Sequence, residues 1–278
     1  MKVAAVIILF LNFFIASGQV KEERIAINGT TSDSEIEKDI SYLWEKEIKS
    51  QTFLKKLDKN PFQLSSMDIH SILGSNDRSK DDDSNFFSTY TGVLGENFER
   101  VDFHFYSVLK KKNQDYDLKA LMKKGDSIDT LSGHLKLIEA FTFPELFTDN
   151  KMKAMVFLYE FNFKSENPNR RFTIKGTSSV CFYIKDNIAE NFWLEDGSFR
   201  EYIRTFVGYY IDNKTNQKLN CVFALDVAGL YSYLPFCDGF YYIDEENPDY
   251  YFIKDKYKQY GWQEYDYTKP IKDKWWKK

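Results

Sequence analysis

The chain has 278 residues, a formal net charge of −4 and an aromatic content of 18%. This acidic balance excludes a protein that attracts nucleic acid through its whole surface. Three cysteines are too few for a disulfide scaffold, and their odd number leaves at least one thiol without a partner inside the chain.

The first predicted element is an export leader over residues 1–18. Lys2 precedes an apolar run, Val3–Ile15, and the small residues Ala16–Gly18 then supply a signal-peptidase site. The run is shorter than the ~20 residues that cross a bilayer, which favours a cleaved leader over an uncleaved anchor. The mature chain is therefore expected to be exported to the periplasm or the extracellular space, with no transmembrane segment after leader removal.

Residues 19–85 are predicted to form a helical segment followed by a linker. A capping box begins at Ser34, and apolar residues at helical spacing continue an amphipathic helix to about Leu57. A shorter helix follows and ends at Gly74. The polar residues 75–85 favour a linker over a calcium loop, because consecutive aspartates without glycine do not match the alternate ligand spacing.

From residue 86 the apolar period becomes two, which predicts an antiparallel β domain over residues 86–278. The abundant rings favour the same structure, because they suit pleated, half-buried surfaces. Short polar turns join neighbouring runs as hairpins, and no helix-length pattern permits parallel crossovers. Strands are expected near residues 87–94, 99–110, 115–123, 127–143, 152–164, 172–184, 204–212 and 219–227.

Glycines inside these runs, at positions 92, 133, 176 and 208, would weaken a flat sheet but suit a strongly bent one. We therefore expect a mainly β fold, α+β overall, in which a meander of about eight strands closes into a calycin-like barrel or a sandwich. The N-terminal helix is expected to pack against this sheet or to plug one end. The last 50 residues, dense in rings, are expected to cover it.

The cysteines allow two interpretations. A bridge between Cys221 and Cys237 would close a loop around a probable turn at Leu234 and Pro235. Alternatively, all three cysteines are small buried apolar residues.

No sequence signature of catalysis is present: the chain has no nucleophile elbow, phosphate loop, zinc helix, dinucleotide fingerprint or Cys-x-x-Cys pair. We therefore assign no catalytic residue, cofactor or metal site, and an enzyme is the less favoured class. His104 and His134 are expected on the polar faces of strands. A speculative ligand surface is predicted where acidic residues lie among rings that can stack on sugars; its residues are Asp238, Tyr241, Tyr242, Asp244, Glu245 and Trp262.

The C-terminal residues Lys269–Lys278 form a basic tip that includes Trp275 and Trp276. Such a tip either contacts an anionic envelope polymer or lipid surface, or is a frayed, solubilising end.

Five segments resemble a group of uncharacterised exported proteins of Bacteroidetes-type bacteria. They span roughly residues 86–265 and are Phe87–Val101 (FSTYTGVLGENFERV), Arg204–Tyr210 (RTFVGYY), Asn216–Val222 (NQKLNCV), Leu234–Asp238 (LPFCD) and Lys256–Gln263 (KYKQYGWQ). The acidic segment of that group is replaced here by Tyr241, Tyr242 and Ile243. The group has no assigned activity, so the resemblance implies only export and a single-domain architecture.

The sequence thus favours an exported, non-enzymatic binding or envelope-associated β domain, whose ligand is a glycan or another envelope component. The alternative is a secreted glycan hydrolase that uses a carboxylate pair near the C-terminal acidic segment.

Overall fold

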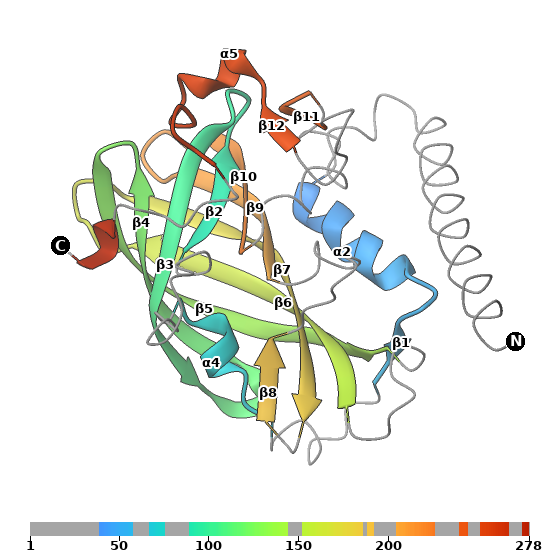
Figure 1. Ribbon diagram of the computed structural model, residues 1–278. Coiled ribbons are helices and arrows are strands. Elements are labelled where there is room, and N and C mark those ends of the chain that lie inside the picture. The colour runs from blue at the N-terminus through green and yellow to red at the C-terminus, as the bar shows by residue number, and fades with distance from the viewer. Residues whose placement is uncertain are drawn as a thin grey trace, which may run out of the picture. The chain divides into compact units, whose positions relative to one another are not determined.

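The computed structural model describes residues 39–57, 67–75, 89–143, 152–185, 188–191, 204–225, 239–243, 251–266 and 274–277 (Figure 1). The residues from Ile40 onward belong to one compact unit, separate from Met1–Asp39. The predicted leader, the capping box at Ser34 and most of the predicted linker lie outside the described residues.

Within the described chain, eight antiparallel strands close into a barrel (Figure 1). Each strand pairs with the next along the chain, and the last one pairs with the first. This closure confirms the predicted meander and selects the barrel over the sandwich. The strands are β2 (Tyr90–Leu94), β3 (Glu99–Lys110), β4 (Tyr116–Lys124), β5 (Ser127–Thr142), β6 (Met152–Ser165), β7 (Phe172–Lys185), β9 (Thr205–Asp212) and β10 (Lys218–Ala224).

The alternation in the sequence decides which side of each strand is buried. In β4 the residues Tyr116, Leu118, Ala120 and Met122 are almost fully buried, whereas the intervening Asp117 and Lys119 are exposed. Successive side chains of a strand point to opposite faces, so the first set lines the barrel interior and the second lies on its outer wall.

The barrel interior is filled by aromatic rings. Phe206 stacks on Phe223 with ring centroids 4.6 Å apart, and Phe103 lies on the same ring of Phe223 at 4.0 Å. Phe105 and Phe161 pack around this stack, and all five rings are at most 1% exposed. Burying rings of this size supplies much of the hydrophobic stabilisation of the fold.

Two facing glycines allow β7 and β9 to approach closely. Gly176 and Gly208 are opposite each other in the register. A Cβ atom on Gly208 would lie 2.1 Å from the carbonyl oxygen of Lys175, and one on Gly176 would lie 2.2 Å from that of Val207. Glycines inside the strands predicted a bent, closed sheet, and at these two positions the physical reason for glycine is the close contact between the two backbones.

Helix α2 (Ile40–Ser50) packs on the outer wall of the barrel. Its buried residues Ile40, Trp44 and Ile48 belong to the same apolar cluster as Val207, and the Ile40 N–H donates to Tyr209 Oη at 2.7 Å. The helix ends earlier than the sequence predicted.

After a short turn, the chain forms strand β1 (Lys55–Lys56), which pairs with the end of β5. The apolar spacing that continues to Leu57 is therefore not helical. The Leu57 N–H donates to the carbonyl oxygen of Ala140, so pairing with the barrel overrides the local pattern.

The short helix α4 (His70–Leu73) closes the barrel end at which β2 and β4 begin. Three apolar side chains of this segment are fully buried among the side chains that fill the barrel: Ile69, Ile72 and Leu73. Tyr90 Oη donates to the carbonyl oxygen of Leu73 at 2.8 Å, and the Ile69 N–H donates to Tyr116 Oη at 3.1 Å. The helix ends at Gly74, as predicted, but with extended backbone instead of a left-handed turn. The plugging role proposed for the first helix thus belongs to the second.

The C-terminal segment covers another part of the outer wall. Phe240 and Trp262 pack on Phe98, and with Ile253 they belong to the outer apolar cluster that also contains Val222 of β10. The remaining described elements are η3 (Lys112–Gln114), β8 (Ile188–Asn191), β11 (Tyr241–Ile243), β12 (Tyr251–Ile253), α5 (Asp255–Lys258) and η7 (Trp275–Lys277).

Candidate functional site

In the described part of the chain, side chains fill the barrel interior, unlike the open ligand cavity of a calycin. Helix α4 covers one end. At the other end Lys124 pairs with Glu99 at 2.9 Å, and Arg170 pairs at 3.1 Å with Asp129, which is only 3% exposed.

The interior nevertheless contains polar groups near α4. Tyr116 Oη donates to Gln114 Oε1 at 2.8 Å, whereas Tyr159 Oη and Ser178 Oγ, on paired strands, have no hydrogen-bond partner among the described residues. Burial raises the pKa of both tyrosines well above the usual range, so their hydroxyls stay protonated.

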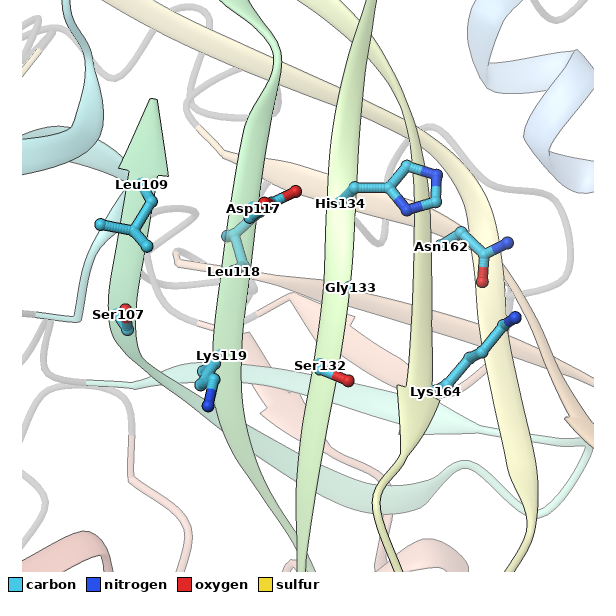
Figure 2. A pocket seen from close by; sticks show the side chains of 10 residues that line it. All are labelled: Ser107, Leu109, Asp117, Leu118, Lys119, Ser132, Gly133, His134, Asn162 and Lys164. Carbon is cyan, nitrogen blue, oxygen red and sulfur yellow. The ribbon is translucent and has the colours of Figure 1, made fainter. Parts of the chain in front are cut away.

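A groove of about 430 Å³ lies on the outer wall of β3, β4, β5 and β6 (Figure 2). Its lining residues lie on this four-strand face, whereas α2 and much of the C-terminal segment pack on outer-wall residues of β2, β6, β7, β9 and β10. The residues that line the groove are Ser107, Leu109, Asp117, Leu118, Lys119, Ser132, Gly133, His134, Asn162 and Lys164.

The strand register arranges the polar lining in two rows. Asp117, His134 and Asn162 are paired across β4, β5 and β6, and we call them the hydrogen-bonding row. Lys119, Ser132 and Lys164 are paired across the same strands, and we call them the lysine row. Figure 2 shows the two rows parallel to each other, with Ser132 between the two lysines. Paired side chains on one face have Cβ atoms ~5 Å apart, so each row is a continuous polar surface.

Small residues make this part of the wall concave. Ser132 and Ser107 stand among longer side chains, and the chain bulges between Phe105 and Ser107. The extra residue of this bulge, Tyr106, is 47% exposed beside the groove. Bulges of this kind redirect side chains and are common next to binding sites.

The groove lining carries more positive than negative charge. Asp117 pairs with Lys111 at 2.8 Å, with both side chains about half exposed. Lys119 and Lys164 are exposed, and neither has a carboxylate partner among the described residues. Asn162 Oδ1 is buried and has no hydrogen-bond partner within the described part of the chain. The groove therefore offers two unpaired ammonium groups and one unused acceptor.

The sequence placed its speculative ligand surface elsewhere. Trp262 is 1% exposed and its Nε1–H donates to the carbonyl oxygen of Phe98 at 2.6 Å, so this ring packs in the core and does not face a ligand. Tyr241 is half-buried in the outer cluster, and Tyr242 is 53% exposed. Asp238, Asp244 and Glu245 lie outside the described residues.

Two of the three cysteines, Cys181 and Cys221, lie in the described chain, and both are buried. Cys221 is a free thiol inside the barrel wall, and burial raises its pKa to about 12. Cys237, the predicted bridge partner of Cys221, lies outside the described residues.

The end of the chain is not frayed where it is described. Trp275 and Trp276 are 3% and 9% exposed, and Trp276 stacks on His104 of β3 with ring centroids 5.2 Å apart. The two rings are used in packing, so a surface contact through them would require the tail to detach.

The groove residues were not singled out from the sequence, except that His134 was expected on a polar strand face, where the structure places it exposed. A signal was present in retrospect. Outward positions of consecutive strands carry polar residues, and Ser132 and Gly133 form a small-residue pair in the middle of β5.

Comparison with protein-family models, with curated proteins and with solved structures finds no match to this chain. Among the described residues, no helix is long and apolar enough to cross a bilayer. The same residues contain no group of three or more His, Cys, Asp or Glu side chains that could hold a metal ion.

Proposed function

We propose that the chain is an exported, envelope-associated binding domain that holds a glycan in the groove of its outer wall. The observation that carries this proposal is the hydrogen-bonding row. Carboxylate, imidazole and amide groups on a rigid, concave strand surface present the donors and acceptors that sugar hydroxyls require. Leu109, 59% exposed at the edge, adds an apolar contact for the face of a sugar ring.

The groove supports binding better than catalysis. Glycoside hydrolysis generally needs two carboxyl groups about 5 to 9.5 Å apart across the substrate. Asp117 is the one carboxylate among the lining residues, and it is ion-paired with Lys111. The hydrolase hypothesis rests on carboxylates outside the described residues, and no described observation favours it.

The test is a polysaccharide array probed with the purified protein and two variants. Ser132→Trp fills the groove, and the double variant Lys46→Ala/Lys55→Ala is the control. Lys46 lies on α2, and Lys55 lies on β1 near the far end of β5, about eight residues or roughly 27 Å along the strand from His134.

We expect the wild type and the control to bind the same glycans and Ser132→Trp to lose them, with folding of each variant checked by its melting temperature. Equal binding by Ser132→Trp would refute the groove. Release of reducing ends from a bound glycan would refute the non-enzymatic assignment.

A further inference from the structure

We infer that the groove selects an acidic glycan, whose carboxylate or sulfate group lies over Ser132 between Lys119 and Lys164. The inference rests on the proposed function and specifies its ligand class. The first observation is that the lysine row contains no carboxylate. Ser107 of β3 is paired with Lys119 and extends the row by one strand. Hydrogen-bond donors therefore follow one another across four strands: Ser107, Lys119, Ser132 and Lys164.

The geometry of the row suits one anionic group. Lys119 and Lys164 are separated by two strand spacings, about 10 Å between their Cα atoms, and flexible lysine side chains from both sides can converge on a group between them. The Ser132 hydroxyl adds a donor at the centre. Hydrogen bonds from ammonium groups to an anion are about twice as strong as those between neutral groups.

No carboxylate of the described residues forms an ion pair with these lysines, although Glu160 and Glu166 lie two residues from Asn162 and Lys164. Asp117 is already paired with Lys111. Lys175, paired with Asn162 across β6 and β7, is exposed and also lacks a carboxylate partner in the described chain. A third unpaired ammonium group therefore borders the groove, although the chain as a whole is acidic.

The hydrogen-bonding row specifies the rest of the ligand. Asn162 Oδ1 is buried and has no hydrogen-bond partner in the described chain, so it is best satisfied by a donor such as a sugar hydroxyl. The two rows are two residues apart along each strand, about 7 Å, which is comparable to the width of one sugar ring. An acidic sugar can place its anionic group on the lysine row and its hydroxyls on the other row at the same time. A lipid headgroup would satisfy the lysines and leave the second row unused.

The test uses polygalacturonate and its fully methyl-esterified form, which share a backbone and differ in charge. The affinity of both polymers is measured by biolayer interferometry for the wild type, Lys119→Ala/Lys164→Ala, Ser132→Trp and the control Lys46→Ala/Lys55→Ala. We expect the wild type and the control to bind the acidic form at least about tenfold more tightly than the ester. In Lys119→Ala/Lys164→Ala this preference should fall to within about twofold.

The other outcomes separate the two proposals. Equal wild-type affinity for acid and ester, with both lost in Ser132→Trp, overturns the acidic-glycan inference and leaves the groove as the glycan site. Absence of binding to either polymer, or unchanged binding by Ser132→Trp, overturns both. Retention on vesicles of anionic phospholipid that requires Lys119 and Lys164, without binding to the polymers, assigns the lysines to a lipid surface and also overturns the inference.

Discussion

Two tyrosines in the barrel interior provide a test of the packing at the α4 end. Tyr116 and Tyr159 are both fully buried, and their ring centroids are 6.3 Å apart. The Tyr116 hydroxyl donates to Gln114 Oε1 and accepts from the Ile69 N–H, whereas the Tyr159 hydroxyl has no partner. Removing each hydroxyl by substitution with Phe should therefore have opposite effects.

The magnitudes follow from what each change leaves behind. Tyr116→Phe removes the acceptor of the buried Ile69 N–H and the donor to Gln114 Oε1, each loss costing roughly 1–3 kcal/mol, and we expect a loss of about 3 kcal/mol in total. Tyr159→Phe removes a hydroxyl whose unpaired burial already costs roughly 1–3 kcal/mol. Its free energy of unfolding should stay unchanged or rise by about 1 kcal/mol.

Urea unfolding at neutral pH, followed by the fluorescence of the buried Trp44 and Trp262, measures both values. Hydrogen exchange provides a second measurement, because the Ile69 amide should exchange faster in Tyr116→Phe and not in Tyr159→Phe. A loss above about 1 kcal/mol in Tyr159→Phe would show that its hydroxyl is hydrogen-bonded. Equal losses in both variants would refute the role given to the Tyr116 bonds in holding α4.

Other predictions concern the wall, the cover and the buried thiol. Gly208→Ala must open a 2.1 Å contact towards 3.0 Å and should lower the free energy of unfolding by about 3 kcal/mol. Gly125→Ala should lower it by about 1 kcal/mol, because a Cβ there meets nothing within 4 Å but φ is +55°. Urea unfolding measures both values, and equal losses would contradict the close approach of β7 and β9. Trp262→Ala should lose about 3–5 kcal/mol and Tyr242→Ala less than about 0.5 kcal/mol in the same assay, whereas similar values would contradict a core role for Trp262. Burial raises the pKa of Cys221 from 9.0 to about 12, so its contribution to stability is complete below about pH 9 and is lost as pH rises towards 12. The fall in stability between about pH 8 and about pH 10 should be smaller in Cys221→Ala, and an equal fall would contradict the shift.

The strands were predictable because their signal is local. Alternation along each segment indicates both the strand and its buried side, and the eight strands of the barrel begin and end within three residues of the predicted bounds. The choice between a barrel and a sandwich was not predictable in this way. It depends on the pairing of β10 with β2, which brings Phe223 opposite Gly92, and no short-range pattern indicates that two segments 130 residues apart are neighbours.

The groove could not be assembled from the sequence for the same reason. Alternation does place Asp117 and Lys119 on the outer wall, but the register decides which residues are neighbours. A slip of one residue between β4 and β5 would separate Asp117 from His134 and Lys119 from Ser132. The opposite error arose at Trp262, because residue type alone does not tell whether a ring faces solvent or packs beneath a C-terminal cover.

The response to salt distinguishes a local anion site from the charge of the whole protein. The chain is acidic, so its overall field repels a polyanion, whereas Lys119, Lys164 and Lys175 attract an anionic group at the groove. Lowering NaCl from about 0.15 M to about 0.01 M lengthens the Debye length from about 8 Å to about 30 Å and strengthens whichever effect dominates. We expect the affinity for polygalacturonate to rise as salt is lowered, because contact with unpaired lysines acts at shorter range than the overall field, and the affinity for the methyl ester to stay constant. A fall in affinity for the acidic polymer at low salt would mean that overall repulsion dominates, and that the lysine row does not hold its carboxylates.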